Sequence, residues 1–587
     1  MTSAPAPEPG IVPPAGDGPP WRAAALALLV AALISFTGVF DHSLWTPDEP
    51  RDAEIGRAML VDGDWVVPKL AGESFLEKPP LSWWVMAGMY RVFGVSDGVA
   101  RSVSALAGLL TLMLLFDLMR RVANSTSALV SVIVAATTFG FYRHFHRAIV
   151  DPWLALFVML GYWAFVVSAY RDREAPPRSA RPWAPGVVVL YLAAGLAFLV
   201  KGLIGPATIF APVCLAILVE RRWGYLRSWA HLPGLLLCAL LCAVWPIMLY
   251  QRGGWDLLKV FVVDNLLYRV APPDAGEGVY VGGHRQAVWY YLTVFIPMLA
   301  PWLVAAPAMV KWLKDRRTPP EWDRRALIFL ACVFPVGLLM LSVPGTKREV
   351  YLLPLYAPFA GAIGAWLVAT SAAERRRPLD NGTHGTLIAL LGLAGMAVGV
   401  GLYMADHVAA VRKLAGEGFA PATLGVRLLA ILLIAGSVYL MTRGMQLWRR
   451  GDARMALAAP WLAVFVACVG MTAIFLRVDP AINLHRMTAD LKAMNAFATP
   501  VAGFRSDEIT RGLIPFDTGR TLRDFRDPDD LARFMRENPA GRLLVLERNT
   551  EHMTPEVRDR LTLVRKWSYG ERRIYCLYEF KPGASAR

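Results

Sequence analysis

The chain has 587 residues, of which 56% are hydrophobic and 18% are charged. Soluble globular proteins carry about a quarter charged residues, so the composition argues against a water-soluble protein. The formal net charge of +15 is compatible with nucleic-acid binding, but arginine-rich loops that set membrane topology explain it better, and we expect no nucleic-acid partner. The six cysteines show neither metal-ligand spacing nor a disulfide framework.

The N-terminal segment, residues 1–21, is rich in proline, alanine and glycine, and we expect a disordered cytoplasmic tail. The apolar run that follows it, 22–40, has no basic region before it and no small-residue cleavage site after it. We therefore interpret this run as a retained membrane helix and not as a removed signal peptide.

About thirteen apolar runs follow one another along the chain, each near the ~20 residues that cross a bilayer. They lie at 22–40, 99–118, 126–142, 152–170, 186–203, 205–219, 232–250, 288–310, 325–343, 350–370, 385–404, 422–442 and 456–475. The stretch 186–219 can be read as one span broken at Lys201 or as two. Strongly basic connections stay in the cytoplasm, and they alternate with less basic ones along the whole chain only if the stretch 186–219 forms two spans. This pattern predicts a transmembrane domain at 22–476 with its N-terminus inside and its C-terminus outside.

The tail, residues 477–587, changes composition. The runs 541–549 and 572–580 are typical of short strands, and 527–538 and 554–561 of helices. The predicted fold is thus a polytopic α-helical membrane protein with a small extracytoplasmic α/β domain at its C-terminus.

The first outer loop, 41–98, is unusually long, and loops of this length are usually functional. We expect interfacial helices at 50–60 and 81–93. The pair Asp48–Glu49 has two readings. It can cap a helix that starts near Thr46, or it can be functional, because acids at the end of a transmembrane helix are costly.

Several further charges are predicted on the same outer face. Lys78 precedes the second interfacial helix, where free N–H groups favour an anion, although taken alone it is better explained as a lysine that reaches the lipid headgroups. Asp151 can cap the helix that begins at Pro152. Lys201 interrupts an apolar run, where an unpaired charge is expensive. Such a collection at one membrane face suits chemistry on a lipid with an anionic head better than a transport site at the midplane.

The run 48–94, "DEPRDAEIGRAMLVDGDWVVPKLAGESFLEKPPLSWWVMAGMYRVFG", resembles the first outer loop of the aminoarabinose transferase-like enzymes. These belong to the protein mannosyltransferase-related integral membrane glycosyltransferases of the GT-C superfamily. The resemblance continues through "VDPWLALF", "FLVKGLIG", "NLLYR", "GHRQAVWYYL" and "KREVYLLPLYAP", and covers roughly residues 22–480. It implies thirteen transmembrane helices, a periplasmic C-terminal domain and a bacterial inner membrane location.

The activity that the resemblance implies is transfer of a sugar, with inversion, from a polyprenyl (typically undecaprenyl) phosphate donor to an extracytoplasmic acceptor. We favour a membrane glycolipid acceptor, lipid A or a related envelope glycolipid. Two alternatives stay open. One is a protein hydroxyl as acceptor, as in the mannosyltransferases, and the other is a non-catalytic lipid or polymer transporter.

The resemblance also implies roles for individual residues. Asp48 corresponds to the first-loop catalytic acid and Asp151 to the second, and we add Glu49 as a catalytic candidate. The residues expected to bind substrate are Lys78, Arg269, Lys201, Lys347 and Tyr351, with Lys78 and Arg269 on the donor phosphate. Asp48 would be the general base for a hydroxyl acceptor and would orient the donor sugar for a phosphate acceptor.

Metal binding is left open. Before the position of Arg269 the best-studied branch has an acid followed by a histidine, whereas this chain has leucines and a tyrosine at 266–268. We therefore expect no obligatory metal. A divalent metal stays possible, with Glu77 and His284 as weak candidate ligands.

Overall fold

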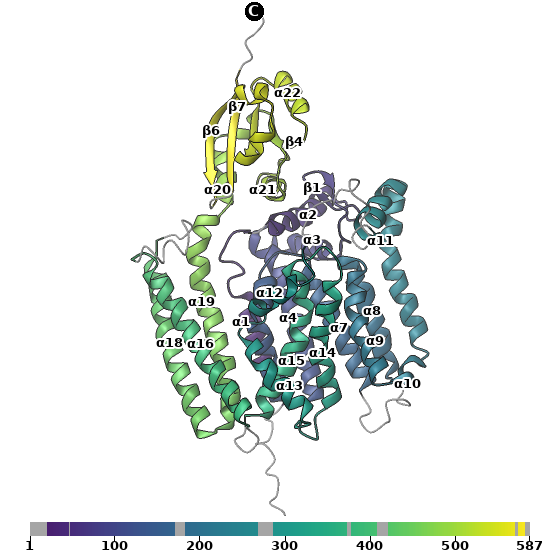
Figure 1. Cartoon of the computed structure of the whole chain (residues 1–587). Helices are drawn as coiled ribbons and strands as arrows, with labels where there is room; N and C mark the ends of the chain where they lie inside the picture. Colours follow the sequence, from purple (N-terminus) through teal and green to yellow (C-terminus); the bar gives the residue numbers. More distant parts are fainter. Residues whose placement is uncertain are drawn as a thin grey trace, which may run out of the picture.

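The computed structural model describes residues 20–45, 47–170, 182–267, 286–371, 377–407, 421–569 and 573–581. It consists of a bundle of long helices and a smaller domain that contains a β-sheet, connected by helix α19 (Ala458–Ile482) (Figure 1). The predicted tail up to residue 19, Thr46, Arg269 and His284 lie outside the described residues.

Among the described residues, nine helical segments are long and apolar enough to cross a membrane. They are built on α4 (Asp97–Val122), α7 (Asp151–Ala169), α8 (Ala184–Lys201), α11 (His231–Lys259), α14 (Arg324–Ser342), α15 (Leu353–Ala369), α16 (Pro378–Met404), α18 (Leu424–Arg450) and α19. The chain is therefore a multi-pass membrane protein.

Two further candidate spans are bent. Helix α5 (Ser125–Thr137) meets α6 (Phe139–Phe145) at 68°. Helix α12 (Tyr290–Met298) meets the segment Trp302–Lys314, which ends in α13 (Ala306–Lys314), at 99°. With these pairs the number of candidate spans rises to eleven within the described part of the chain.

Two shorter apolar helices, α1 (Pro20–Phe36) and α9 (Ile204–Val219), complete the bundle. Helix α8 ends at Lys201, and Gly202 follows with a φ of 63° before α9 begins. The stretch 186–219 thus forms two helices. The break occurs at Lys201–Gly202 because glycine adopts a left-handed backbone without a steric penalty.

Helix α15 lies in the centre of the bundle, and nearly all of its side chains are buried. A Cβ at Gly364 would lie 2.6 Å from Cα of Ser131 in α5, so the two backbones approach closely only because the side chain is missing. Small residues at such crossings are the usual means by which helices pack in membranes.

The loop 41–98 covers one end of the bundle. It forms α2 (Asp48–Asp62), a short hairpin of β1 (Lys69–Leu70) and β2 (Glu73–Ser74), and α3 (Leu81–Phe93), so helices lie at both places where they were expected. In Figure 1, α2 lies between the bundle and the sheet domain.

The C-terminal domain contains a five-stranded sheet in the order β4-β3-β5-β7-β6. Strand β3 (Val501–Phe504) pairs in parallel with β4 (Arg523–Phe525) and β5 (Arg542–Leu546). Strand β7 (Ile574–Phe580) is antiparallel to β5 and to β6 (Leu561–Ser568).

Helices α20 (His485–Ala493), α21 (Glu508–Thr518), α22 (Pro528–Glu537) and α23 (Pro555–Asp559) surround the sheet. Two clusters of buried apolar side chains give the domain a core of its own. Strands β5 and β7 and helices α22 and α23 lie where the sequence predicted them. Strands β3, β4 and β6 and helices α20 and α21 were not predicted.

Candidate active site

Asp48 is the first residue of α2, and no side chain makes a capping hydrogen bond at this end of the helix. Its carboxylate instead contacts Arg51 of the same helix at 2.8 Å and accepts hydrogen bonds from both terminal nitrogens of Arg348. Burial opposes ionisation, but the charge of Arg51 and the hydrogen bond and charge of Arg348 outweigh it and hold the pKa of Asp48 below its usual range. Asp48 is therefore an ionised carboxylate of low basicity.

A polar cavity of about 30 Å³ opens beside Asp48. It is lined by Asp48, Arg51, Asp52, Lys78, His144, Arg147, Ile149, Asp151, Arg348, Glu349 and Val350. The structure thus brings together Asp48, Lys78 and Asp151, three predicted site residues that are far apart in sequence. A cavity of this size holds a water or two, so a sugar enters it only when lining side chains move.

Two cations of this cavity, Lys78 and Arg147, have no hydrogen bond or ion pair from their side chains to any other described residue. Lys78 is buried, and both burial and the charge of Arg51 lower its pKa. Arg147, in the turn between α6 and α7, has its pKa lowered by burial and by the charge of Arg143. Buried cations without a direct ion pair are costly, and an anionic ligand would reduce that cost.

A second cavity of about 230 Å³ adjoins this group and is mainly apolar. Its apolar lining includes Leu154, Leu203, Ile204, Ala207, Phe261 and Leu341, and its polar residues include Glu77, Lys201, Asn265 and Tyr351. Lys201 forms an ion pair with Asp151 and lies 4.1 Å from the ring centre of Tyr351. The Lys201–Asp151 pair therefore connects the apolar cavity to the polar one.

Glu49 does not line either cavity. Its side chain is 1% exposed and accepts hydrogen bonds from Arg101 Nε and from the backbone N–H groups of Ala148 and Trp45, each at 2.9 Å. Its position contradicts the predicted catalytic role, because every oxygen is used to connect the first loop to α4 and to the α6–α7 turn. These structural hydrogen bonds explain Glu49, while Asp48 faces the cavity.

Lys347 is also displaced from its predicted role. It is 2% exposed, and its ammonium group donates to the carbonyl oxygens of Pro344 at 2.6 Å and Gln286 at 3.2 Å. These bonds hold its own loop, and Lys347 does not line either cavity. The adjacent residue, Arg348, lines the polar cavity instead.

Metal ligation has limited support in this region. No group of three or more His, Cys, Asp or Glu side chains among the described residues is arranged to hold a metal ion. Glu77 lines the apolar cavity, whereas His284 lies outside the described part of the chain.

Six charged or polar residues of the cavity were not among the predicted site residues, namely Arg51, Asp52, His144, Arg147, Arg348 and Glu349. A signal was present for some of them. Arg51 and Asp52 follow the acidic pair in "DEPRD", and the basic run "RHFHR" directly precedes Asp151. Sequence alone could not tell which of these side chains face inward.

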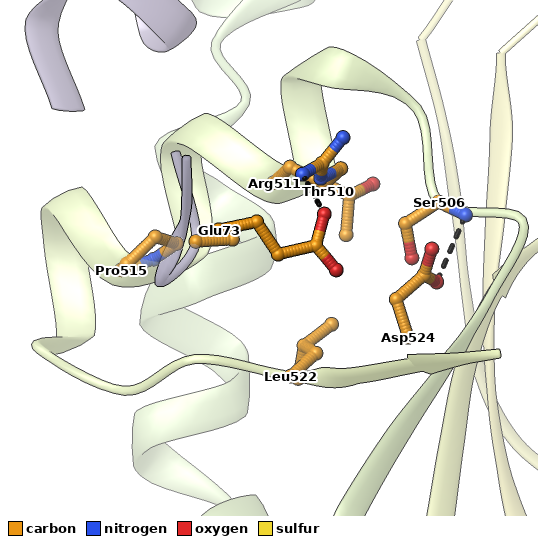
Figure 2. A pocket seen from close by; sticks show the side chains of 8 residues that line it. Glu73, Ser506, Thr510, Arg511, Pro515, Leu522 and Asp524 are labelled. Atoms are coloured by element: carbon orange, nitrogen blue, oxygen red, sulfur yellow. Dashed lines mark hydrogen bonds and ion pairs between the residues drawn. The ribbon is translucent and has the colours of Figure 1, made fainter. Parts of the chain in front are cut away.

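The C-terminal domain reaches this site through α21. A Cβ on Gly512 would lie 2.5 Å from the carbonyl group of Pro50, so α21 contacts the backbone of α2 directly. Glu508 forms an ion pair with Arg51 at 2.6 Å. Arg511 pairs with Glu73 of the hairpin at 2.6 Å, beside a small pocket between the two parts (Figure 2). The contacts of Glu508 and Gly512 thus hold the first turn of α2 against the C-terminal domain.

Known proteins resemble this chain in sequence. Residues 77–247 match the family model described as dolichyl-phosphate-mannose-protein mannosyltransferase. The chain is 30% identical over 378 residues to the undecaprenyl phosphate-alpha-4-amino-4-deoxy-L-arabinose arabinosyl transferase of Edwardsiella ictaluri (strain 93-146), which is 64% of each chain. It is 29% identical over 384 residues to the enzyme of that name from Pseudomonas aeruginosa (strain UCBPP-PA14), 64% of this chain and 65% of the relative. The chain thus spans slightly less than two thirds of the length of these curated relatives.

Solved structures show the same fold. The apo structure of ArnT from Cupriavidus metallidurans superposes with a TM-score of 0.71 and 19% identity, covering 95% of this chain and 98% of that one. The structure of the same protein bound to undecaprenyl phosphate gives a TM-score of 0.67 over 96% of this chain and 98% of that one. The chain therefore has the fold of these integral membrane glycosyltransferases and resembles the aminoarabinose transferases in sequence, as its first loop predicted.

Proposed function

We propose that this protein is an inverting glycosyltransferase that moves a sugar from an undecaprenyl phosphate donor to an envelope glycolipid, with lipid A as the preferred acceptor. The observation that carries the proposal is that two cations, Lys78 and Arg147, make no direct ion pair with a described residue and lie beside an adjoining apolar cavity. Cations for a phosphate next to an apolar space for a polyprenyl chain fit a lipid-linked sugar donor. The names of the relatives support this choice of donor.

In this proposal the leaving group is a polyprenyl phosphate, which gains negative charge as the bond to the sugar breaks. Lys78 and Arg147, together with the predicted Arg269, stabilise that charge where it develops. Because the cations are already held in a buried site, little reorganisation is needed at the moment of reaction. No general acid is required, since the phosphate leaves as an anion.

The low basicity of Asp48 helps to distinguish between the possible acceptors. A general base works best with a pKa near the working pH, whereas the arginines keep Asp48 ionised and weakly basic. This supports an acceptor that is already ionised, such as a phosphate group on lipid A, over a protein hydroxyl. Asp48 and Asp151 then orient the sugar and stabilise positive charge at its anomeric carbon.

The topology is part of the proposal. We infer that the nine long spans, the two bent pairs and the two short apolar helices all cross, giving thirteen transmembrane segments. The N-terminus lies in the cytoplasm, and the polar cavity and C-terminal domain face the periplasm of a bacterial inner membrane. We further propose that no divalent metal is obligatory, so that transfer continues in a chelator.

The test uses purified full-length protein in detergent with radiolabelled undecaprenyl phosphate-aminoarabinose and lipid A. Wild type is expected to move label into lipid, and Asp48→Asn and Lys78→Met to lose about 10²-fold or more of the rate. Lys69→Met is a matched control, because Lys69 lies in the same loop but pairs with Asp62 and Asp64 outside both cavities.

Label that appears in added envelope protein instead of lipid would favour the mannosyltransferase-like alternative. Equal transfer by wild type and both site variants would contradict the proposed site. Lipid movement without any new glycosidic bond would point to the transporter. Repeating the wild-type reaction with a chelator decides the metal requirement.

A further inference from the structure

His144 is a buried side chain that the proposed mechanism does not yet use. It lies in α6, is 1% exposed, and lines the polar cavity together with Asp48 and Asp151. Nothing in the sequence distinguishes it from His146, two residues further along. The two histidines differ in what their ring nitrogens contact, and only His144 is among the residues that line the polar cavity.

The hydrogen bond at Nδ1 fixes where the proton of His144 lies. Nδ1 is 2.7 Å from the carbonyl oxygen of Gly140. A carbonyl oxygen can only accept, so Nδ1 carries the proton and Nε2 of the neutral ring is an acceptor. Nε2 is buried and has no hydrogen-bond partner among the described residues. The Glu349 carboxylate lies 3.8 Å away, beyond hydrogen-bonding distance.

Leaving a buried polar atom without a partner costs about 1–3 kcal/mol, and folded proteins keep few such atoms. His146 differs, since its Nδ1 lies 2.6 Å from the Tyr142 carbonyl oxygen and its Nε2 lies 2.8 Å from that of Ile34, so backbone oxygens contact both nitrogens. The same segment therefore holds one histidine whose two nitrogens both contact backbone oxygens and one whose free acceptor lines the cavity. That acceptor is available to a ligand.

Each carboxylate around His144 already has at least one protein partner. Asp48 is bound by Arg51 and Arg348, Asp151 by Lys201, Asp52 by Trp83 and Arg51, and Glu349 by Arg143. The cavity is thus rich in donors and cations, which suit a phosphate. A sugar also brings hydroxyl donors, and Nε2 of His144 is a buried neutral acceptor in the described lining that no protein group engages.

We propose that Nε2 of His144 accepts a hydrogen bond from a hydroxyl group of the transferred sugar and thereby selects the donor sugar. This inference rests on the proposed function and assigns a substrate-recognition residue to the same site. The phosphate is held by Lys78 and Arg147, so His144 distinguishes a sugar-bearing lipid from the bare lipid phosphate. A site built around such a bond discriminates against sugars that lack the hydroxyl at that place.

The experiment measures how tightly the purified full-length protein binds two probes, undecaprenyl phosphate and undecaprenyl phosphate-aminoarabinose. His144→Asn keeps an amide that can donate to Gly140 but removes the acceptor at Nε2. We expect it to weaken binding of the sugar-bearing lipid about tenfold, the value of one good hydrogen bond, and to leave binding of undecaprenyl phosphate unchanged. His144→Gln, whose amide oxygen reaches about as far as Nε2, is expected to restore part of the loss.

His146→Asn serves as the matched control. It keeps an amide that can donate to the Tyr142 carbonyl oxygen but removes the contact with Ile34, so it is expected to lower the melting temperature without changing the ratio of the two affinities. If His144→Asn leaves that ratio as in wild type, whether both affinities fall together or neither changes, His144 is merely structural and the inference is overturned. A wild type that binds neither probe would instead overturn the proposed function, and the inference with it.

Discussion

Arg51 of α2 and Glu508 of α21 form an ion pair, with Nη1 and Oε2 2.6 Å apart, that joins the membrane domain to the C-terminal domain. Arg51 also contacts Asp48 at 2.8 Å. A carboxylate of the C-terminal domain is therefore separated from the proposed site only by one guanidinium group. Through this contact the C-terminal domain can influence the position of Arg51 and Asp48 in α2.

Replacing Glu508 tests whether this ion pair affects the proposed site. In Glu508→Gln, Arg51 loses one of its three carboxylate partners and is expected to move toward Asp48, and small displacements of this kind cost up to about 10²-fold in rate. We expect sugar transfer to fall about tenfold, while the free energy of unfolding changes by less than about 1 kcal/mol, because Glu508 is half exposed. Initial rates and thermal unfolding of the same preparations measure both quantities.

Glu579→Gln is the control for this prediction. Glu579 pairs with Arg542 at 2.8 Å within the C-terminal sheet and is similarly exposed, but it makes no contact with α2. Equal rates for Glu508→Gln and Glu579→Gln would show that the Arg51–Glu508 pair does not act on the site.

The close approach of α21 to α2 predicts opposite effects for two glycine-to-alanine changes. In Gly512→Ala the new Cβ meets the backbone of Pro50 at 2.5 Å, and the strain is expected to cost about 1–3 kcal/mol. Gly88→Ala, inside α3, meets nothing within 4 Å and is expected to stabilise by up to about 1 kcal/mol through helix propensity. Melting temperatures of the two variants, one lower and one higher than wild type, check the packing. A Gly512→Ala variant as stable as wild type would mean that the domains are not docked this way.

Glu49 is expected to matter for stability and not for chemistry. Glu49→Gln leaves the buried Arg101 without its counter-charge, which typically costs about 3–5 kcal/mol. The fraction of protein that remains folded should retain the wild-type rate per molecule, in contrast to Asp48→Asn. Activity normalised to folded protein, after size-exclusion chromatography, separates the two cases. A Glu49→Gln variant that is well folded but inactive would contradict this prediction and support the catalytic role first expected for Glu49.

The buried carboxyl of Glu54 predicts a pH dependence of stability. Burial raises its pKa to about 6 from an ordinary value of 4.5, even though Arg57 hydrogen-bonds to it and lowers the pKa in part. Between these two values the folded state binds more protons than the unfolded state, so stability falls as pH rises from about 4.5 through 6 and is flat above. The change amounts to about 2 kcal/mol.

The measurement for Glu54 is the difference in melting temperature between wild type and Glu54→Gln across pH 4.5–8 in the same detergent, because other groups titrate equally in both. As the pH rises to about 6–7, the melting temperature of wild type should fall relative to that of the variant. Above that pH the difference between the two melting temperatures should stay constant. A difference that is constant over the whole range would show that Glu54 ionises normally in the folded protein.

Much of the architecture could be predicted from the sequence because the signals are local. Each long apolar run forms a helix, since backbone groups in a bilayer must bond within their own segment. The break at Lys201–Gly202 follows from a charge and a glycine in an apolar run, and the loop helices from their pattern of aromatic and polar residues. Strands β5 and β7 carry dense apolar residues, whereas β3 is only four residues long and the exposed β6 gives a weak pattern.

The site could be predicted only in part. The sequence alone determined that acids and bases collect in the loops at one end of the helices, and the resemblance pointed to Asp48, Lys78 and Asp151. Only the tertiary structure shows that Glu49 bonds to Arg101 and to backbone N–H groups, and that Lys347 bonds to backbone carbonyl groups. It also shows that Arg348 and Arg147 line the cavity. The choice between adjacent residues such as Lys347 and Arg348 depends on the direction of each side chain from its backbone. That direction is fixed by packing against segments hundreds of residues away, for which a single sequence carries no local signal.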